Sequence, residues 1–364
     1  MPWRRRGHRA RHRGCRVSAR RHTDLLIIGA GPFGLGLARH ASKLGIDHAI
    51  VGRPMEFWRN NMPRGMLLRS GVRWHLDPAN ELTFRQYMHE TSVDRADLRP
   101  LGLEPYLEYA KWFQDRAGIA PINSLVSSLT QADDGFEALL DDGSIVRAGQ
   151  VALAIGFHPF AHVPGELGDM LPAGRWSHTR DFVSMEHVAG RRYAIVGGRQ
   201  SAFEWAALLA DEGADAIHVI HRHPTPNFER SDWSWVEELL GASEYEPGWW
   251  QSLPDAERER IGGAFWSEGR LKLEPWLAPR LDPARVHLWP ECTITDARAG
   301  EDALALELSC PAAEVEVDHV ILATGFRPDL ARVDFLAPAL REQIRTDGGF
   351  PVLDAHFQTT VPRL

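Results

Sequence analysis

The sequence lacks the features that would mark a membrane, secreted or hydrolytic protein. No apolar run approaches the roughly 20 residues needed to span a bilayer, and the first residues have no apolar centre of the kind found in secretory signals. The sequence contains neither a Gly-x-Ser-x-Gly nucleophile elbow nor a His-Glu-x-x-His zinc motif. These absences predict a cytoplasmic protein without a membrane partner, and they leave a hydrolase interpretation without support.

Cysteine is scarce. The three cysteines are Cys15, Cys292 and Cys310, and no Cys-x-x-Cys pair occurs. This spacing excludes a thioredoxin-type redox dithiol on adjacent turns, and it predicts a protein whose cysteines are reduced.

Acidic residues are missing from the first 22 residues, which contain nine arginines. The rest of the chain has 32 basic and 49 acidic residues, a formal charge of −17. An acidic body disfavours nucleic acid as the main partner. We expect residues 1–22 to be a disordered basic tail or a start codon set too early, with a nucleic-acid arm or an organelle presequence as alternatives, and the fold to begin at Asp24.

Two glycine turns stand about one half-chain apart. The first is Gly-Ala-Gly-Pro-Phe-Gly at 29–34, after the apolar run 25–28, and the second is Gly-Gly-Arg-Gln-Ser-Ala at 197–202, after the run 193–196. Glycine permits the tight turn and lets a diphosphate approach backbone N–H groups at the positive end of a helix. One such turn is weak evidence, whereas two predict a protein that holds a flavin and a nicotinamide dinucleotide face to face.

Each turn begins a strand–helix–strand unit. Helical spacing predicts helices over 33–44 and 203–210, followed by strands at 48–51 and 216–220. Each unit is followed by an antiparallel meander that leads to a short apolar strand ending in glycine. We therefore predict an α/β fold with two Rossmann-like nucleotide-binding domains, three-layered and with antiparallel meanders, in which the second domain interrupts the first.

The predicted boundaries follow from this repeat. Residues 23–165 form the first part of the FAD-binding domain, residues 166–290 form the NAD(P)H-binding domain, and residues 291–364 return to the FAD-binding domain. An insertion at 225–285 carries six tryptophans, which are Trp233, Trp235, Trp249, Trp250, Trp266 and Trp276. Two interpretations stay open for these indoles: they line a substrate pocket or lid, or they fill a subsidiary core or a subunit interface.

Two further motifs lie outside the glycine turns. The first, a linker fingerprint of the form FxGxxxHxxx(aromatic) with proline at its first position, consists of Pro172, Gly174, His178 and Phe182. The second has the pattern DxxxLATG(aromatic) and spans 318–326.

With these motifs, the chain from Asp24 onward resembles the class B flavin-dependent monooxygenases, the group of flavin-containing monooxygenases, Baeyer-Villiger enzymes and lysine or ornithine N-hydroxylases. The second motif is associated with N-hydroxylating members. Phe57, Trp58 and residues 65–68 are similar to the stretch near the flavin in those enzymes.

The resemblance implies a specific chemistry. In that group NADPH reduces FAD, the reduced flavin adds dioxygen at its C4a carbon, and the peroxyflavin passes one oxygen atom to a nitrogen, a sulfur or a carbonyl carbon. Protein groups position the substrate and exclude water. An acid or base motif is therefore unnecessary, and we assign neither a catalytic residue nor a metal site.

The glycine turns and the resemblance together define a predicted cofactor site. The first turn contributes Gly29, Gly31, Pro32, Phe33 and Gly34. The second turn contributes Gly197, Gly198, Arg199, Gln200 and Ser201. The other cofactor-binding residues are Trp58, Gly156, Arg222, Thr324 and Gly325.

Arg222 ends the strand after the second turn, where a cation can bind the 2′-phosphate of adenosine and select NADPH over NADH. Arg199 is a second candidate for this role. The alternative interpretations are an ordinary strand–helix turn for the glycines, a helix cap for Ser201 and a solvated charge for Arg222.

Histidines add two expectations. His178 either contacts the hinge between the nucleotide domains or is a structural histidine. His218, His221 and His223 straddle a strand and its exit without a carboxylate or cysteine at ligand spacing, so we predict no metal there.

Three features depart from the family pattern. Relatives place a glutamate that binds the adenosine ribose where Gly52 stands, so Arg53 or Glu56 has to substitute. Arg199 replaces a glycine, so a left-handed backbone there would be strained. In relatives a segment like 359–364 continues into a strand, a turn and a helix that close over the flavin, so we expect this chain to be a fragment or to bind FAD weakly.

The predicted function is an FAD- and NADPH-dependent monooxygenase that uses dioxygen on a small nucleophilic substrate, with an amine favoured by one motif. The alternatives are a flavin-dependent pyridine-nucleotide oxidoreductase without oxygen insertion and a truncated nucleotide-binding remnant. The substrate and the oligomeric state stay open.

Overall fold

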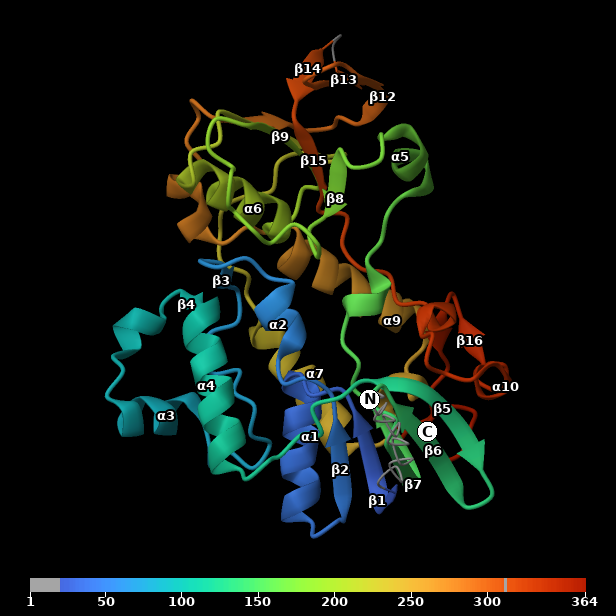
Figure 1. The fold of residues 1–364 in the computed structure, drawn as a ribbon. Coiled ribbons are helices and arrows are strands. Elements are labelled where there is room, and N and C mark those ends of the chain that lie inside the picture. The colour runs from blue at the N-terminus through green and yellow to red at the C-terminus, as the bar shows by residue number, and fades with distance from the viewer. Residues whose placement is uncertain (1–19, 311–312) are drawn as a thin grey trace, which may run out of the picture.

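Two five-stranded sheets form the framework of the computed structural model, which describes residues 20–310 and 313–364. Figure 1 shows one sheet in each half of the molecule, with helices and loops between them. Within the described residues, the helices are too short or too polar to cross a membrane.

The first sheet has the order β2-β1-β7-β6-β5, in which β1 pairs in parallel with β2 and β7 and the other pairs are antiparallel. Its strands are β1 (Arg20–Ile28), β2 (His48–Val51), β5 (Val126–Ala132), β6 (Gly135–Leu140) and β7 (Ile145–Leu153). Helix α1 (Pro32–Lys43) connects β1 to β2, close to the range that helical spacing predicts.

Strand β1 begins earlier than the predicted start of the fold at Asp24. Residues 20–23 pair with residues 145–148 of β7, because β7 continues beyond the predicted short strand and offers them a partner. The rest of the predicted basic tail lies outside the described residues.

Alternate residues of β1 enter two different cores, as expected for a parallel strand buried on both faces. Ile27 packs with α1, α3 (Phe84–Thr91) and α4 (Leu103–Arg116). Leu26 and Ile28 pack against the C-terminal segment 330–364. The elements of that segment are η5 (Leu330–Arg332), α10 (Pro338–Arg341), β16 (Thr346–Asp347) and β17 (Phe350–Pro351).

The second sheet is parallel throughout, with the order β11-β10-β9-β15-β8. Its strands are β8 (Trp176–His178), β9 (Arg192–Val196), β10 (Ala216–Ile220), β11 (Val286–Trp289) and β15 (His319–Leu322). Helix α6 (Gln200–Asp211) covers one face. An antiparallel sheet covers the other face and consists of β12 (Ile294–Ala299), β13 (Leu304–Leu308) and β14 (Glu314–Val317). The predicted α/β class is confirmed.

The chain returns to the first sheet later than the predicted residue 291. Strand β15 pairs with β9 and β8, so it belongs to the second sheet. From Leu330 onward, buried residues of the chain again belong to the core of the first sheet. The expectation failed because the meander before β15 resembles the one in the first sheet. A local sequence pattern does not determine which sheet a strand joins.

Shorter elements lie between these layers. They are α2 (Glu56–Asn60), β3 (Leu67–Leu68), η1 (Arg95–Leu98), β4 (Leu101–Gly102), η2 (His158–Phe160) and α5 (Gly165–Met170). The tryptophan-rich insertion contains α7 (Ser234–Tyr245), α8 (Trp249–Ser252), α9 (Asp255–Ala264), η3 (Phe265–Arg270) and η4 (Pro275–Arg280). The insertion contacts both halves, because η4 packs on α6 while Gln251 of α8 donates to the backbone oxygen of Asp354 (3.2 Å).

Candidate functional site

The first glycine turn brings β1, α1 and the end of β7 into close contact. Gly29 has a φ of 113°, and a Cβ there would lie 2.2 Å from the carbonyl oxygen of Ala154. A Cβ at Gly34 would lie 1.8 Å from the oxygen of Gly29. Backbone packing alone therefore demands glycine at both positions.

Gly31 is different because the space in front of it is open. It is the N-cap of α1, and a Cβ there would meet no atom of the described chain within 4 Å. Among the described residues no side chain caps this helix end, and the first turn contains no acid. Phe33 in that turn is 83% exposed. Uncovered N–H groups at the end of a 12-residue helix beside a bare Cα fit a diphosphate.

A cavity of about 840 Å³ begins at this turn. Pro32 and Phe33 form one side of it, and Trp58, Leu68 and Tyr106 lie among the residues on the others. The ring centroids of Trp58 and Tyr106 are 4.7 Å apart. Most of the lining is apolar, although Arg69, His75 and Asp77 contribute to it. Such a lining suits a flat ring system.

Two segments connect the sheets, one after β7 and one after β15, and these two crossovers run side by side. The N–H of His162 donates to the oxygen of Gly325 (2.9 Å), and the hydroxyl of Thr324 donates to the oxygen of His162. Gly156 and Gly325 have φ values of 66° and 78°, so each crossover turns at a glycine shortly after a strand. Predicted site residues therefore lie on both crossovers, at the junction of the sheets.

Phe326 lies at the centre of this junction. Its ring centroid is 5.9 Å from that of Phe57, 5.8 Å from Phe157 and 5.2 Å from His178. These contacts join α2 and both crossovers in one aromatic cluster.

His178 is buried in β8 next to Phe326. Its Nε2 bonds to the oxygen of Gly325 (2.9 Å), and its Nδ1 accepts the N–H of Arg180 (3.1 Å). This pattern places the proton of a neutral ring on Nε2, and burial lowers the pKa of His178. The interpretation of His178 as a structural histidine is confirmed, because both ring nitrogens are hydrogen-bonded. Its contact with a hinge between nucleotide domains stays a prediction.

The second glycine turn is packed on its flanks. Gly197 has a φ of 150°, and a Cβ there would lie 2.6 Å from the oxygen of Ala323. A Cβ at Gly198 would lie 2.6 Å from the Cβ of His221 and 2.7 Å from Cε1 of His223. Side chains of the loop after β10 thus occupy the space next to Gly198, whereas the space next to Gly31 is open.

Arg199 is the N-cap of α6 with a φ of −116°, so the strain expected from the missing glycine does not arise. Its guanidinium carbon lies 3.8 Å from the centroid of the Trp266 ring. Partial burial, and then the charges of Arg270 and Arg222, lower the pKa of Arg199. Ser201 is exposed within the first turn of α6. The alternative interpretation of Ser201 as a helix cap is wrong, because Arg199 is the N-cap.

Glu204 belongs to the site, and the sequence analysis missed it. It lies one turn after Gln200 on α6 and is 2% exposed. Its Oε1 accepts the N–H of Leu67 in β3 (3.0 Å) and Nη1 of Arg280 in η4 (3.2 Å). Burial raises the pKa of Glu204 to about 7. A lone carboxylate within the apolar run of this helix was the available signal.

The neighbouring Gln200 shares this buried network. Its Oε1 accepts the N–H of Glu274 (3.0 Å). Within the described chain, Nε2 of Gln200 and Oε2 of Glu204 are buried without a hydrogen-bond partner. Gln200 thereby joins α6 to the insertion. Glu204 joins α6 to β3, the strand just before the residues that line the cavity.

The end of β2 explains the departure at Gly52. This residue has a φ of 148°, and a Cβ there would lie 2.8 Å from the nitrogen of Ala30, so no glutamate fits. The two expected substitutes bind each other, with Nη1 of Arg53 2.7 Å from Oε1 of Glu56. Their role toward an adenosine ribose stays a prediction.

The insertion uses its indoles in two ways. Trp233 and Trp235 pack around Phe265, with ring centroids 6.1 and 4.8 Å from it. A Cβ at Gly269 would lie 2.2 Å from the Trp233 ring, so this indole also fixes the end of η3. Trp266 on the same element lies against Arg199 instead. The insertion therefore contains a small core and also contacts the second turn.

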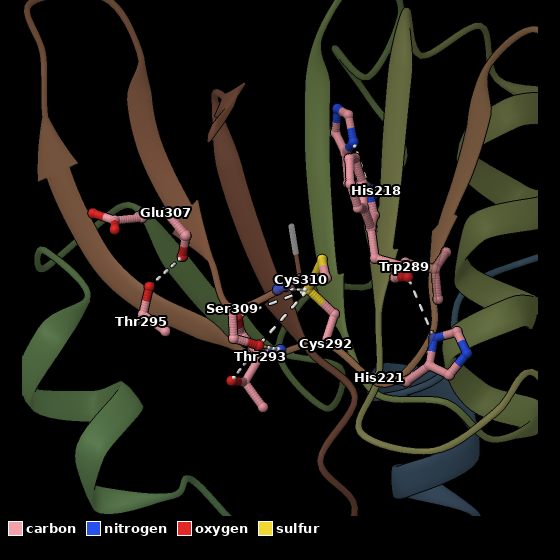
Figure 2. Close-up of a disulfide and its surroundings, with 10 residues drawn as sticks. His218, His221, Trp289, Cys292, Thr293, Thr295, Glu307, Ser309 and Cys310 are labelled. Atoms are coloured by element: carbon pink, nitrogen blue, oxygen red, sulfur yellow. Dashed lines mark hydrogen bonds between the residues drawn. A yellow bond between two sulfur atoms is a disulfide. The ribbon is translucent and has the colours of Figure 1, made fainter. Parts of the chain in front are cut away.

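The described cysteines form a disulfide, so the expectation of reduced cysteines is wrong for Cys292 and Cys310. Strands β12 and β13 pair Ile294 with Leu308, and extending this register by two residues sets the cysteines opposite each other, with Cα atoms 5.1 Å apart. Figure 2 shows the bond at the end of this hairpin. Cys15 lies outside the described residues.

The three histidines near the second turn have partners within the protein. Nδ1 of His218 accepts Nε1–H of Trp289 (3.1 Å), Nε2 of His221 bonds to Oγ1 of Thr225 (3.1 Å), and Nδ1 of His223 bonds to the oxygen of Pro224 (2.7 Å). Figure 2 shows His218 and His221 apart from each other, both on the right of the disulfide. Burial lowers the pKa of His218 to about 4.

Residues 26–239 match the family of pyridine nucleotide-disulphide oxidoreductases, which is more than half of the chain. The chain belongs to this family. An FAD-dependent urate hydroxylase of Xanthomonas campestris is 24% identical over 92% of this chain and 73% of its own length. A ferredoxin–NADP reductase of Thermus thermophilus is 28% identical, over 66% of this chain and 64% of its own length.

Solved structures share the fold. An ornithine N-hydroxylase of Kutzneria has a TM-score of 0.75 at 16% identity, with 93% of this chain and 89% of that chain covered. An L-lysine 6-monooxygenase of Pseudomonas syringae has a TM-score of 0.68 at 18% identity, with 93% and 89% covered. The family match confirms the predicted oxidoreductase class. The solved structures confirm a fold shared with flavin-dependent monooxygenases, and membership in their class B group stays a prediction.

Proposed function

We propose that this protein is an FAD- and NADPH-dependent monooxygenase that transfers one oxygen atom of dioxygen to a small nucleophilic substrate, with an amine as the substrate class. The observation that carries the proposal is the pair of glycine turns, each between a strand with parallel neighbours and a helix N-terminus, in a fold shared with N-hydroxylases.

The first turn is proposed to hold FAD. Its diphosphate would lie at the N-terminus of α1, over Gly31 and beside Pro32 and Phe33. The adjoining cavity of about 840 Å³ would take the flavin ring against Trp58. Gly156, Thr324 and Gly325 would face the ring from the crossovers. The first sheet and the segment 330–364 would then form the FAD-binding unit.

The second turn is proposed to hold NADPH. The diphosphate would lie at the N-terminus of α6, with Gly197, Gly198, Gln200 and Ser201 at the turn. Arg222 and Arg199 are the candidates for the 2′-phosphate, because both stand exposed beside this helix end. The second sheet and the insertion would form the NADPH-binding unit.

Bound FAD, reduced by NADPH, would supply the activation of dioxygen that no side chain provides. The residues of this chain would position the two nucleotides, keep water from the ring through the apolar cavity lining, and hold the junction rigid through Phe326 and the neutral His178. The DxxxLATG(aromatic) motif and the fold shared with ornithine and lysine hydroxylases support an amine as substrate.

A second candidate is a pyridine-nucleotide oxidoreductase that transfers electrons without oxygen insertion. The observation that favours it is the similarity to a ferredoxin–NADP reductase at 28% identity. The same two nucleotide sites would serve that reaction, so geometry at the turns does not separate the candidates.

The test is NADPH oxidation by the purified protein with FAD, screened against ornithine, lysine, cadaverine, urate, a sulfide and a cyclic ketone, with hydrogen peroxide measured in parallel. The proposal expects one substrate class to raise NADPH oxidation and to lower peroxide release, because oxygen then enters the product. Oxidation that always yields peroxide or reduces an added electron acceptor would favour the second candidate.

A further inference from the structure

Three arginines gather beside the second glycine turn, and one of them comes from the insertion. Arg199 is the N-cap of α6, Arg222 follows β10, and Arg270 ends η3. Arg270 stands four residues after Trp266, whose ring centroid lies 3.8 Å from the guanidinium carbon of Arg199. Arg222 stands between His221 and His223, whose side chains lie against Gly198 beside Arg199. The charges of Arg270 and Arg222 help to lower the pKa of Arg199, after its burial. All three side chains are exposed, so the cluster is open to a ligand.

The described residues give this cluster of three arginines no acidic partner. Two arginines of the same half of the molecule have acidic partners: Arg280 pairs with Glu204 and Asp211, and Arg192 pairs with Glu316 and Asp318. By contrast, no carboxylate in the described ranges forms a salt bridge with Arg199, Arg222 or Arg270. The whole chain has more acids than bases, 49 against 41. Three adjacent guanidinium groups that repel one another are a site prepared for a multiply charged anion.

The stacked pair of Arg199 and Trp266 adds a flat surface to this site. The guanidinium carbon lies 3.8 Å from the ring centroid, which is the geometry of a cation–π contact. Trp266 remains 39% exposed. Aromatic rings and guanidinium planes both stack on nucleobases.

The insertion holds η3 in place for this role. Trp233 lies against Gly269, the residue before Arg270, so closely that a Cβ there would clash with the indole. Ser231 donates from Oγ to the oxygen of Gly269 (3.3 Å) and accepts Nη2 of Arg69 (2.5 Å). The position of Trp266 and Arg270 is therefore fixed by packing and by a polar contact with the segment that lines the cavity.

We propose that the insertion completes the coenzyme site. Arg270 binds the 2′-phosphate of NADPH together with Arg222, and Arg199, which is stacked on Trp266, binds the adenine with that indole instead of the phosphate. The inference rests on the proposed function and assigns coenzyme selection to the insertion as well as to the second turn. Adenosine 2′-phosphate matches this site, because its phosphomonoester is a dianion for the arginines and its adenine is a flat ring that can stack on the Arg199–Trp266 pair.

The test is calorimetric titration of the full-length protein, with FAD added, by NADP⁺, 2′-AMP, 5′-AMP and inorganic phosphate. The variants are Arg270→Ala, Arg270→Lys and Trp266→Leu. Arg260→Ala is the matched control, because Arg260 is an exposed arginine of the same insertion that pairs with Glu257. Thermal unfolding of each variant establishes that it is folded.

We expect Arg270→Ala to weaken 2′-AMP and NADP⁺ binding roughly 10- to 100-fold and to leave 5′-AMP unchanged, since a charge-assisted bond to phosphate is lost. Arg270→Lys restores part of the loss. Trp266→Leu weakens 2′-AMP and 5′-AMP by similar factors, about 10-fold.

Three results would overturn the inference. If wild-type protein binds NADP⁺ and Arg270→Ala binds it equally well, the inference fails while the proposed function stands. If inorganic phosphate binds as tightly as 2′-AMP, the site is an anion site only and carries no adenine. If wild-type protein binds none of the nucleotides, the NADPH part of the proposed function fails together with the inference.

Discussion

The two glycine turns look alike in sequence and differ in their surroundings. At the first, the space next to Gly31 is open and leads to an apolar cavity of about 840 Å³. At the second, His221 and His223 fill the space next to Gly198, and three exposed arginines stand near the helix end. An apolar cavity suits a ligand that stays bound, whereas exposed charges suit a ligand that exchanges with solvent.

A glycine turn therefore indicates that a dinucleotide binds, and the residues around the turn indicate which dinucleotide it is. A flavin keeps its ring in the protein through repeated turnovers, and a nicotinamide coenzyme has to leave after each one. The surroundings of each turn agree with that division of roles in the proposed assignment.

The largest expected effect tests the open space at the first turn. Replacing Gly31 by leucine should abolish FAD retention, because the side chain would occupy the space in front of the helix end, yet the fold should remain since no described atom lies within 4 Å of a Cβ there. The measurement is flavin absorbance after gel filtration, with circular dichroism for the fold. Gly262→Leu, at an exposed glycine of α9, is the control and should keep the flavin. A yellow Gly31 variant would remove this turn from the flavin site.

The next effect concerns Glu204, which joins the second turn to the cavity side. Its pKa is raised from 4.5 to about 7, so between these values the folded chain holds a proton that the unfolded chain has released. The free energy of unfolding contributed by this group therefore falls as the pH rises through that window. At about 1.4 kcal/mol per pH unit, the full decrease is about 3 kcal/mol.

Glu204→Gln should remove this decrease, because the amide does not ionise and still accepts the Leu67 N–H. Urea unfolding at pH 5 and pH 8 measures the difference, and Glu212→Gln, an exposed position just after α6, is the control. If the stabilities of wild type and Glu204→Gln differ by the same amount at both pH values, Glu204 does not titrate in this window.

A smaller effect is expected from Arg222 at the second turn. Arg222→Ala should raise the KM for NADPH roughly 10-fold or more and leave that for NADH nearly unchanged, because only NADPH carries the 2′-phosphate. Steady-state NAD(P)H oxidation gives both constants. Equal changes for the two coenzymes would mean that Arg222 does not read the phosphate.

The local units were predictable from the sequence because their signals are local. The helix expected at 33–44 is α1 (Pro32–Lys43), and the strand at 48–51 is β2. Periodicity and glycine stops determine such elements within a few residues of chain. The glycines that pack against the backbone, such as Gly29, were found for the same reason.

Contacts between distant segments were not predictable. Trp266 lies against Arg199 although they are 67 positions apart, and Cys292 meets Cys310 only through the register of β12 and β13. Strand β15 was assigned to the wrong sheet because its neighbours are chosen by tertiary pairing. The expected strain at Arg199 was wrong because its φ of −116° is extended, which a family pattern alone does not reveal.

The smallest expected effect separates the two turns at their adenosine ends. The first has no acid at Gly52, where φ and the nearby nitrogen of Ala30 exclude one, and Glu56 is the carboxylate expected to bind the ribose in its place. Glu56→Gln should weaken FAD binding about 5-fold, since one hydrogen bond to a carboxylate is replaced by a weaker one. Fluorescence titration of FAD measures the change.

Glu257→Gln is the control, because Glu257 forms an equivalent exposed pair with Arg260 and lies in the insertion. Stability should change little in both variants, because each pair is at the surface. If both variants bind FAD like the wild type, the adenosine end of the first turn is held without a carboxylate, and the contrast with the arginine-rich second turn becomes sharper still.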